Sequence, residues 1–330
     1  MEIILAIDGG GSRTRCLAVD RKAQVLGEGA SGPSNHLLVD SAVVKQSLAD
    51  SIDQAITHGR VKRADIACLS AGLAGVDFDG TGAREMEAAF RELGFERAVI
   101  NGDMVIAHAG ALGLSAGVMA LAGTGSAILG VGLNGERVKV GGWGPIYGDE
   151  GSAYRIGQMA LRAAARAYDH CGPDTALKGR LLCALGLSDF RQTLSRVYVD
   201  AMETREIAAL SRVAHEVAEA GDVVARGIFF RAGEELAAGV EAAARQLKLD
   251  ECEVQVSYQG SVLQSCALLR ERFVETLKGR LPKSRVVAPQ SEPVMGAYLL
   301  GRQALGWEVN NLVQDDLDRS IDSGTNVTSR

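Results

Sequence analysis

The stretch Ile3-Ile4-Leu5-Ala6-Ile7-Asp8-Gly9-Gly10-Gly11-Ser12-Arg13-Thr14 joins an apolar run to an acid and three consecutive glycines. The apolar run predicts a buried strand, and the segments 15–20 and 24–29 predict two more. The glycines therefore connect strand to strand, whereas a dinucleotide-binding fingerprint needs GxGxxG at the start of a helix. A P-loop is excluded as well, because no Gly-Lys-Ser/Thr follows the glycines.

The same glycine turn has the chemistry of a phosphate site. The backbone N–H groups of the glycines and the hydroxyls of Ser12 and Thr14 can surround an anion. An acid at the strand end would repel a phosphate unless a cation lay between them, so Asp8 indicates Mg²⁺. The alternative is an ordinary hairpin turn, although such a turn needs only about two special residues.

A second copy of this arrangement begins near residue 117. The run 118–122 predicts a buried strand, Gly123-Thr124-Gly125-Ser126 a turn, and residues 127–132 another strand. Asn134-Gly135 then predicts a tight hairpin turn. Two glycine–hydroxyl hairpins in one chain predict two related domains that face one nucleotide.

Acids also follow other predicted strands. The runs 66–70 and 97–101 predict strands, which end near Gly72 and Asp103. In open α/β sheets, ligands collect at the carboxyl ends of the strands, so Asp8, Gly72 and Asp103 are expected at one edge. The alternative for Asp103 is an N-cap of the helix predicted from Met104 to Leu112.

The stretch Gly141-Gly142-Trp143-Gly144-Pro145-Ile146-Tyr147-Gly148-Asp149-Glu150-Gly151-Ser152 holds five glycines before a helical pattern. On its own it predicts a strand-to-helix turn with an N-capping acid, Asp149 or Glu150. Trp143 is expected to support the core or the wall of a pocket, with stacking on a ligand as the alternative. The remaining pattern predicts helices at 152–168, 174–185, 204–219, 222–248, about 261–279 and 291–305, a strand at 253–258, and a polar tail from Asn310.

Composition limits the classes of partner. The 330 residues carry a net charge of −6, which argues against a general nucleic-acid or anionic-membrane surface. No apolar run approaches the ~18 residues of a membrane span, and no signal-like segment precedes the first strand, so we expect a cytoplasmic protein. The six cysteines form no CxxC pair and no zinc spacing, and each is expected to be a small buried apolar residue.

Taken together, these motifs resemble the BadF/BadG ATPase family of the sugar kinase–Hsp70–actin superfamily, and within it the N-acetylglucosamine kinase branch. The resemblance covers about residues 3–305. Residues 8–14 resemble the first phosphate motif, residues 123–126 the second, and Gly260-Ser261-Val262 the adenosine motif. Gly32-Pro33-Ser34-Asn35, Asn101-Gly102-Asp103 and the 142–152 stretch resemble the sugar-side elements of that branch.

The resemblance implies an α/β fold of two actin-like (ribonuclease H-like) domains with an ATP-binding cleft between them. It implies an N-terminal domain over 1–115, against which a C-terminal helix at about 291–305 packs back. The C-terminal domain would cover 116–290 with a helical insertion, followed by a polar tail at 310–330. Family members are often dimers, so a homodimer is a possible assembly.

The implied activity is the ATP-dependent phosphorylation of an amino sugar, N-acetylglucosamine, to its 6-phosphate, with ATP and Mg²⁺ as cofactors. Asp103 would be the general base that accepts the proton of the sugar 6-hydroxyl, and Asp8 would orient Mg²⁺. The resemblance assigns ATP to Gly9, Gly10, Gly11, Ser12, Thr14, Gly123, Thr124, Gly125, Gly260 and Ser261. It assigns the sugar to Asn35, Asp103, Ser126, Ala127, Gly142 and Asp149.

Other functions stay open at this point. A glucosamine kinase of the same family differs by a few contacts, and the acceptor could also be N-acetylmuramic acid or glucose. An iron–sulfur ATPase that activates a 2-hydroxyacyl-CoA dehydratase needs cysteines around a cluster, and no such paired spacing occurs here. A ROK-type kinase would show a Cys-rich zinc segment, and a non-catalytic sugar sensor would not need both Asp8 and Asp103.

Overall fold

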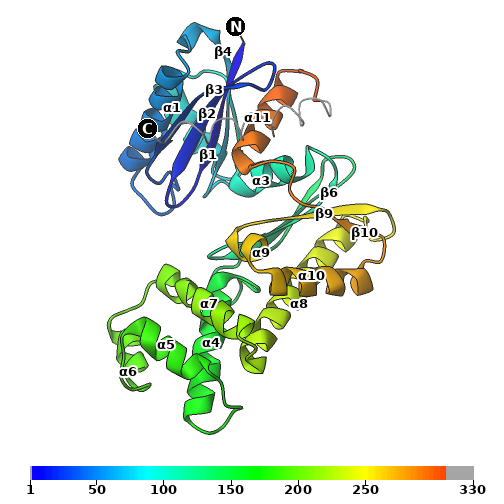
Figure 1. The fold of residues 1–330 in the computed structure, drawn as a ribbon. Helices are drawn as coiled ribbons and strands as arrows, with labels where there is room; N and C mark the ends of the chain where they lie inside the picture. Colours follow the sequence, from blue (N-terminus) through cyan, green and yellow to red (C-terminus); the bar gives the residue numbers. More distant parts are fainter. Residues whose placement is uncertain (1, 310–330) are drawn as a thin grey trace, which may run out of the picture. The chain divides into compact units, whose positions relative to one another are not determined.

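The structure is a computed structural model that describes residues 2–309. Its described residues form two α/β units, one of residues 2–116 with 288–309 (unit 1) and one of Gly117–Val287 (unit 2). Each unit contains one five-stranded mixed sheet with helices packed on it (Figure 1). The polar tail predicted at 310–330 lies outside the described residues.

The sheet of unit 1 is built around its first strand. The strand order is β3-β2-β1-β4-β5, with β1–β2–β3 antiparallel and β4 and β5 parallel to β1. Residues 3–7 of β1 are at most 1% exposed, as expected for an apolar run covered on both faces. The strands are β1 (Ile3–Gly9), β2 (Thr14–Asp20), β3 (Val25–Ser31), β4 (Ile66–Leu73) and β5 (Ala98–Gly102).

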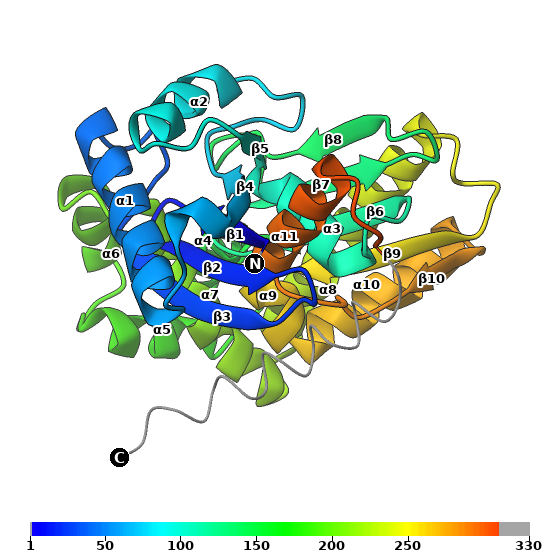
Figure 2. The same cartoon turned by 90° about the horizontal axis from the view of Figure 1, so that it is seen from above.

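Helices cover both faces of this sheet. Helix α1 (Ser41–His58) packs on β2 and β3, and its Leu48 joins the core that contains Leu5. Helices α3 (Asp103–Leu112) and α11 (Pro293–Ala304) pack on each other and on the other face, where Gly301 lies against Ile4 (Figure 2). Unit 1 is completed by η1 (Arg63–Asp65) and α2 (Ala83–Glu92).

Unit 2 repeats the same sheet topology. Its order is β10-β9-β6-β7-β8, with β6–β7–β8 antiparallel and β9 and β10 parallel to β6. Read outward from β6, this order matches the one around β1, so the repeat predicted from the two glycine hairpins is confirmed. The strands are β6 (Gly117–Ala122), β7 (Ser126–Val131), β8 (Arg137–Gly141), β9 (Val254–Gln259) and β10 (Ser284–Val286).

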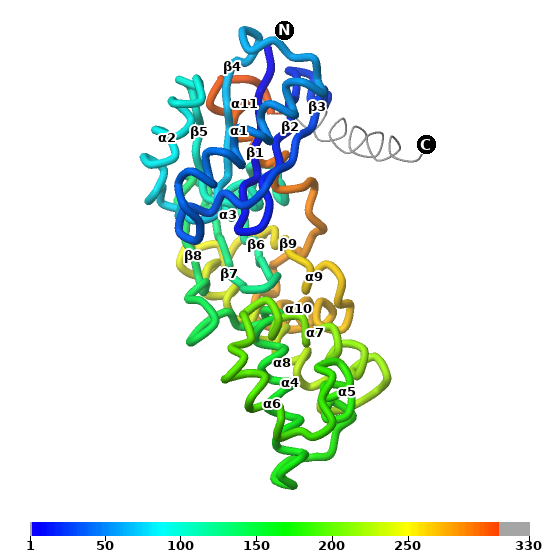
Figure 3. The backbone as a smooth tube through the Cα atoms, turned by 90° about the vertical axis from the view of Figure 1, so that its left-hand side faces the viewer, coloured from blue at the N-terminus to red at the C-terminus, as the bar shows by residue number. Residues whose placement is uncertain are grey.

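A helical segment between β8 and β9 forms most of the rest of unit 2. Helix α8 packs on β6, β7 and β8, while α4, α5 and α7 pack together beside it (Figure 3). The helices are α4 (Ala153–Tyr168), α5 (Leu177–Leu185), α6 (Gln192–Leu194) with a π-helical turn η2 (Ser195–Val199), α7 (Thr204–Glu219), α8 (Val223–Gln246), α9 (Ser261–Ser265) and α10 (Ala267–Arg280).

Two local predictions are wrong, and three short elements were not predicted. The helix predicted over about 261–279 is interrupted at Cys266, whose backbone is extended (φ −100°, ψ 97°) and whose side chain is buried. The short elements β10, α6 and η2 carry no periodicity long enough to detect. Cys171, Cys183 and Cys252 are exposed because they lie at turns or on an outer helix face, whereas Cys16, Cys68 and Cys266 are buried as expected. Within residues 2–309, no helix is both long and apolar enough to cross a bilayer.

Candidate active site

Two acids meet at the carboxyl edge of the unit 1 sheet. Asp8 of β1 pairs with Gly72 of β4, and Gly72 pairs with Asn101 of β5. Asp103 follows as the first residue of α3. A methyl group on Gly72 would lie 2.3 Å from Ile106 Cγ1, so this glycine lets α3, which begins with Asp103, pack closely against β4 beside Asp8. The predicted placement of Asp8, Gly72 and Asp103 at one sheet edge is confirmed.

The electrostatics of this pair favour a bound cation. Burial and the neighbouring charge of Asp103 raise the pKa of Asp8 to about 6, from 3.8, whereas Arg15 and Arg13 act in the opposite direction. Mg²⁺ usually keeps several waters and takes one or two protein carboxylates plus substrate phosphates. A single half-buried carboxylate beside a phosphate-type turn therefore fits Mg²⁺.

Asp103 is held by the start of its own helix. Gly102 is the N-cap of α3, so the capping alternative for Asp103 is wrong. The Met104 N–H donates to Asp103 Oδ1 at 2.8 Å, which orients the carboxylate at the positive end of the helix.

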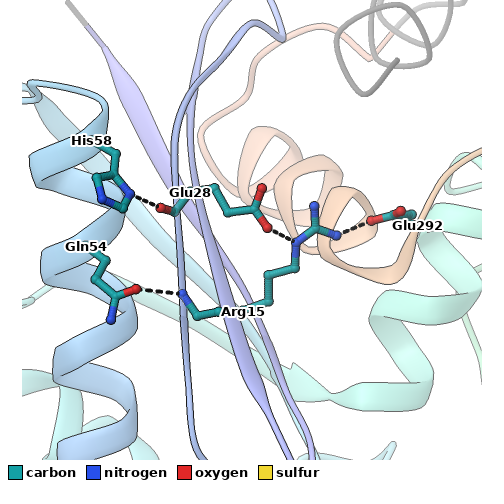
Figure 4. Close-up of polar contacts among 6 residues, drawn as sticks. Arg15, Glu28, Gln54, His58 and Glu292 are labelled. Atoms are coloured by element: carbon teal, nitrogen blue, oxygen red, sulfur yellow. Dashed lines mark hydrogen bonds and ion pairs between the residues drawn. The ribbon is translucent and has the colours of Figure 1, made fainter. Parts of the chain in front are cut away.

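Arg15, Glu28, Glu292 and His58 form a group of polar contacts, here called the arginine cluster, beside the strand that carries Asp8 (Figure 4). Arg15 is the cross-strand partner of Asp8, and its Nε donates to Glu28 Oε1 at 2.6 Å. Its Nη1 forms a second ion pair with Glu292, the N-cap residue of α11. His58 Nδ1 lies 2.7 Å from the Glu28 carbonyl oxygen, which ties α1 to the same cluster. These contacts join β2, β3, α1 and α11 around the strand that carries Asp8.

The first glycine turn is shorter than predicted. β1 extends to Gly9 and β2 begins at Thr14, so that Gly10, Gly11, Ser12 and Arg13 form the turn. Gly11, Ser12 and Arg13 are exposed and Gly10 is half-buried, and the Gly10 N–H donates to the Arg13 carbonyl at 2.8 Å.

Gly9 and Thr14 serve the packing of this turn. A methyl group built on Gly9 would lie 2.3 Å from Ser34 Oγ and 2.5 Å from Leu73 Cδ2. Thr14 is 0% exposed and donates its hydroxyl to the Gly32 carbonyl at 2.8 Å. We therefore assign both residues to the structure of the turn rather than to direct contact with ATP.

Asn35 is placed beside the first turn. The Ser34 N–H donates to the Gly10 carbonyl at 3.0 Å, so the 32–35 loop is attached directly to the turn. Asn35 Oδ1 accepts the Leu37 N–H at 3.0 Å and lies 2.8 Å from the position of a methyl group on Gly75. Asp8, Asp103, Asn35 and residues 10–13 thus form the candidate site of unit 1.

In unit 2, Asp149 connects the second glycine turn to the glycine-rich loop. The Ser126 N–H donates to Asp149 Oδ1 at 3.4 Å, and a methyl group on Gly125 would lie 2.9 Å from Asp149 Oδ2. Asp149 is 7% exposed and has a left-handed backbone (φ +58°), which is unusual for a non-glycine residue. Burial raises the pKa of its carboxyl group.

The loop after Gly141 differs from prediction at the cap of the following helix. Ser152 is the N-cap of α4 and accepts the Arg155 N–H at 3.2 Å, so the assignment of Glu150 as the cap is wrong. Glu150 instead accepts the Ser126 hydroxyl on its backbone carbonyl at 2.7 Å. Trp143 is 66% exposed and stacks on Tyr147, so it is not a core residue, but it lines a cavity of unit 2, which fits the expected wall support.

The predicted sugar-side residues of unit 2 lie together. Ala127 pairs with Gly141 across the β7–β8 hairpin, and a methyl group on Gly142 would lie 3.1 Å from Ala127 Cβ. Ser126 and Ala127 line a cavity of about 360 Å³ that is bordered by Trp143 and by α8.

Two predicted ATP residues line a larger cavity of unit 2. Thr124 and Ser261 both contribute to a cavity of about 530 Å³. A methyl group on Gly260 would lie 2.4 Å from the Ala122 carbonyl oxygen, and its φ of +92° also requires glycine. The predicted second phosphate turn and adenosine motif therefore meet at one hollow, whose size suits a nucleoside.

The sequence did not identify the far wall of this cavity. Helix α7 contributes Arg205, Arg212, His215 and Glu216, and α8 contributes Phe229. His215 lies edge-on to Phe229, with ring centroids 5.5 Å apart. An amphipathic pattern identifies α7 as a surface helix but does not show which polar residues face a ligand.

Comparison with known proteins covers nearly the whole chain. The model of the BadF/BadG/BcrA/BcrD ATPase family matches residues 5–301. A Clostridium acetobutylicum protein named N-acetylmuramic acid/N-acetylglucosamine kinase is 30% identical over 303 residues, 92% of this chain and 99% of the relative. A Dictyostelium discoideum N-acetyl-D-glucosamine kinase is 29% identical over 310 residues, 91% of this chain and 97% of the relative.

Solved structures share the fold. A Chromobacterium violaceum protein described as a proposed N-acetylglucosamine kinase superimposes with a TM-score of 0.73 at 24% identity, over 91% of this chain and 98% of its own. A ROK family glucokinase from Streptomyces griseus gives a TM-score of 0.55 at 16% identity, over 91% and 99% of the two chains.

Proposed function

The chain belongs to the BadF/BadG/BcrA/BcrD ATPase family, and on that basis we propose that it is an ATP-dependent kinase that phosphorylates the 6-hydroxyl of N-acetylglucosamine. The relatives that match over nearly its whole length are named as kinases of N-acetylated amino sugars. The observation that carries the proposal is the pair Asp8 and Asp103 at one sheet edge beside an exposed glycine turn.

Asp103 is the proposed general base. Phosphoryl transfer depends mainly on positioning and charge neutralisation, and a base accepts the hydroxyl proton as the oxygen attacks the γ-phosphate. The Met104 N–H orients the carboxylate at the start of α3, and Asn35 is assigned to the sugar hydroxyls. In unit 2, Asp149, Ser126, Ala127 and Gly142 are assigned to sugar binding.

ATP is assigned to exposed or half-buried residues of both turns. Gly11 and Ser12 in unit 1 and Thr124 and Gly125 in unit 2 offer N–H and hydroxyl donors for phosphate oxygens, whereas the Gly10 N–H is bonded within its turn and Gly10 contributes through its backbone shape. Mg²⁺ bound through Asp8 would neutralise charge on the phosphates. The nucleoside is assigned to the cavity that Thr124 and Ser261 line.

Other acceptors define the alternatives. The Clostridium relative's name includes N-acetylmuramic acid, which makes this carboxylated amino sugar a second candidate acceptor. A Vibrio cholerae glucosamine kinase is 30% identical over 180 residues, 54% of this chain and 59% of the relative. Because that match covers a smaller part of both chains, glucosamine is the weaker candidate.

The test is ADP release by the purified chain with ATP and Mg²⁺ and one sugar at a time. We expect turnover with N-acetylglucosamine well above the sugar-free rate, and a product whose phosphate NMR places the new ester at O6. Glucosamine, glucose and N-acetylmuramic acid are the comparison substrates. Turnover with none of the four sugars would refute the proposal.

A further inference from the structure

We propose that His215 determines which nucleotide base the protein prefers, by accepting on Nδ1 a hydrogen bond from the 6-amino group of adenine. This inference rests on the proposed kinase function, because it places the base in the cavity assigned to the nucleoside. The ligand class that this contact selects is a 6-aminopurine nucleotide over a 6-oxopurine nucleotide. ITP, which carries a 6-oxo group in place of the 6-amino group of ATP, is the probe.

His215 belongs to the face of α7 that lines the nucleoside cavity. Ala208, Ser211, Arg212 and His215 all line it, at the spacing of one helix face. Helix α7 packs on α8, whose buried Phe229 lines the same cavity (Figure 1). The edge-on contact between His215 and Phe229, with ring centroids 5.5 Å apart, therefore holds the imidazole at the cavity wall.

The two ring nitrogens of His215 have different surroundings. Nε2 is buried, and Oε1 of Glu219, one helical turn further along α7, lies 3.5 Å from it. A proton on Nε2 is attracted by this carboxylate oxygen, whereas a lone pair on Nε2 would be repelled by it, so the proton is favoured on Nε2. In a neutral imidazole the other nitrogen, Nδ1, is then a hydrogen-bond acceptor.

Nδ1 is the nitrogen that a ligand can reach. Within the described part of the chain Nδ1 has no hydrogen-bond partner, and Nε2 is the only nitrogen of this ring that is buried without one. Nδ1 is therefore accessible, on a side chain that is 33% exposed and lines the cavity. Its lone pair can accept an N–H of a 6-amino group, whereas it would be repelled by the lone pairs of a 6-oxo group.

The other polar side chains of α7 on this cavity are less suited to select a 6-amino group. The carboxylate of Glu216 already forms an ion pair with Arg180. Arg205 and Arg212 carry N–H donors only, so they would favour a 6-oxo group. The hydroxyl of Ser211 can donate or accept and does not distinguish the two groups. A preference for 6-aminopurines therefore points to Nδ1.

The experiment compares kcat/KM for ATP and ITP at pH 8, with saturating N-acetylglucosamine, in the wild type and in His215→Phe. The wild type should prefer ATP. The phenyl ring can neither accept from the 6-amino group nor repel the 6-oxo group, so the ATP-to-ITP ratio should fall by about ten- to hundredfold, the usual effect of losing a hydrogen bond in a buried site. The KM for the sugar should stay unchanged.

Glu219→Gln tests the tautomer without changing the ring. The amide can donate or accept, so it allows either nitrogen of His215 to carry the proton, and Nδ1 can then donate to a 6-oxo group. We expect kcat/KM to rise for ITP and to change little for ATP, which a purely structural role of His215 would not produce. Glu271→Gln, at an exposed carboxylate of α10 in the same unit, should change neither value.

Failure of this inference can be told from failure of the proposed function. A wild type that uses ATP and ITP equally, or equal losses with both nucleotides in His215→Phe, would overturn the inference and leave the kinase proposal standing. If the wild type phosphorylates no sugar, the kinase proposal fails, and calorimetric titration with ADP and IDP still measures the base preference. Tighter binding of ADP that is lost in His215→Phe would support the inference, whereas equal binding or no binding would overturn it.

Discussion

At the scale of single residues, the protein brings two carboxylates together at a sheet edge and gives them different surroundings. Asp8 is half-buried between an acid and two arginines, whereas Asp103 sits at the start of a helix with a backbone N–H on one oxygen. This difference matches their proposed roles, one toward a cation and the other toward a proton.

Asp103→Asn should lower kcat by about 10²–10⁴-fold, the usual contribution of a positioned general base. The amide can still hydrogen-bond a sugar hydroxyl, so the sugar dissociation constant should change much less. Steady-state kinetics and calorimetric titration with the sugar measure the two quantities. Asp53→Asn, on the exposed face of α1, is the matched control. Near-normal kcat in Asp103→Asn would show that another group accepts the proton.

Asp8→Asn should stabilise the Mg²⁺-free protein at pH 8. The folded state raises the pKa of Asp8 from 3.8 to about 6, so proton binding to Asp8 stabilises the folded protein fully below about pH 4. This stabilisation is lost as the pH rises through 6. Removing the ionised group should therefore raise the free energy of unfolding at pH 8 by at most about 3 kcal/mol.

Urea denaturation of both proteins at pH 5 and pH 8, without metal, measures this effect. The advantage of Asp8→Asn should shrink at pH 5, where the wild-type carboxyl group is largely protonated. Added Mg²⁺ and ATP should stabilise the wild type more than the variant. A variant that is less stable than the wild type at pH 8 would contradict the assigned burial cost.

At the scale of elements, the turn from β9 into α9 depends on a glycine. Gly260→Ala would bring a methyl group to 2.4 Å from the Ala122 carbonyl oxygen in a left-handed backbone (φ +92°). We expect a loss of about 2–4 kcal/mol in the free energy of unfolding, because backbone atoms must move. The dissociation constant for ATP should also rise, since Ser261, which lines the cavity proposed for the nucleoside, would shift.

Gly227→Ala is the control for this change. Gly227 lies inside α8, and among the described residues no atom outside its own helical turn lies within 4 Å of a methyl group there. Alanine should therefore stabilise the helix by about 0.5–1 kcal/mol. Similar effects of the two substitutions would show that the backbone at Gly260 is not constrained as described.

At the scale of the whole molecule, unit 1 is assembled from two distant parts of the chain. Helix α11 buries Val294, Met295, Tyr298 and Leu299 to 1% exposure or less. It also carries the Glu292 end of the arginine cluster, and the Tyr298 hydroxyl donates to the Asp20 carbonyl at 2.8 Å.

Ending the chain after Val287 should therefore leave unit 1 unable to fold, although residues 2–116 remain. Four large buried side chains at about 1.5–3 kcal/mol each are comparable to the stability of a whole domain. Circular dichroism and soluble yield measure the outcome. Tyr298→Phe removes two hydrogen bonds, the one that the hydroxyl donates to the Asp20 carbonyl and the one that it accepts from Arg302 Nη1, and should cost about 1–3 kcal/mol and leave the fold intact. A shortened protein with a cooperative transition for unit 1 would refute the dependence on α11.

The order of strands and turns was predictable from sequence because it is a local property. An apolar run followed by glycines determines where a strand ends, and the recurrence of that pattern at 118–126 predicts the second sheet before any contact is known. Asp8 and Asp103 were identified for the same reason, since each directly follows a strand whose end is visible in the sequence.

The roles of individual side chains were decided by packing between distant segments. The Thr14 hydroxyl was expected to contact a phosphate, but it donates a hydrogen bond to the Gly32 carbonyl. Glu150 was expected to cap α4, but the N-cap residue is Ser152. The sequence around Trp143 and around the three exposed cysteines does not show that these side chains are exposed, because exposure depends on which distant segments pack over a residue.

The sequence by itself therefore determined the class of fold, its internal repeat and the two carboxylates. Only the tertiary structure decided that Thr124 and Ser261 line one cavity and that α7 forms its far wall. The physical reason is that the end of a strand follows from neighbouring residues, whereas the contacts around this cavity depend on sheet register and on the packing of helices that are distant in the sequence.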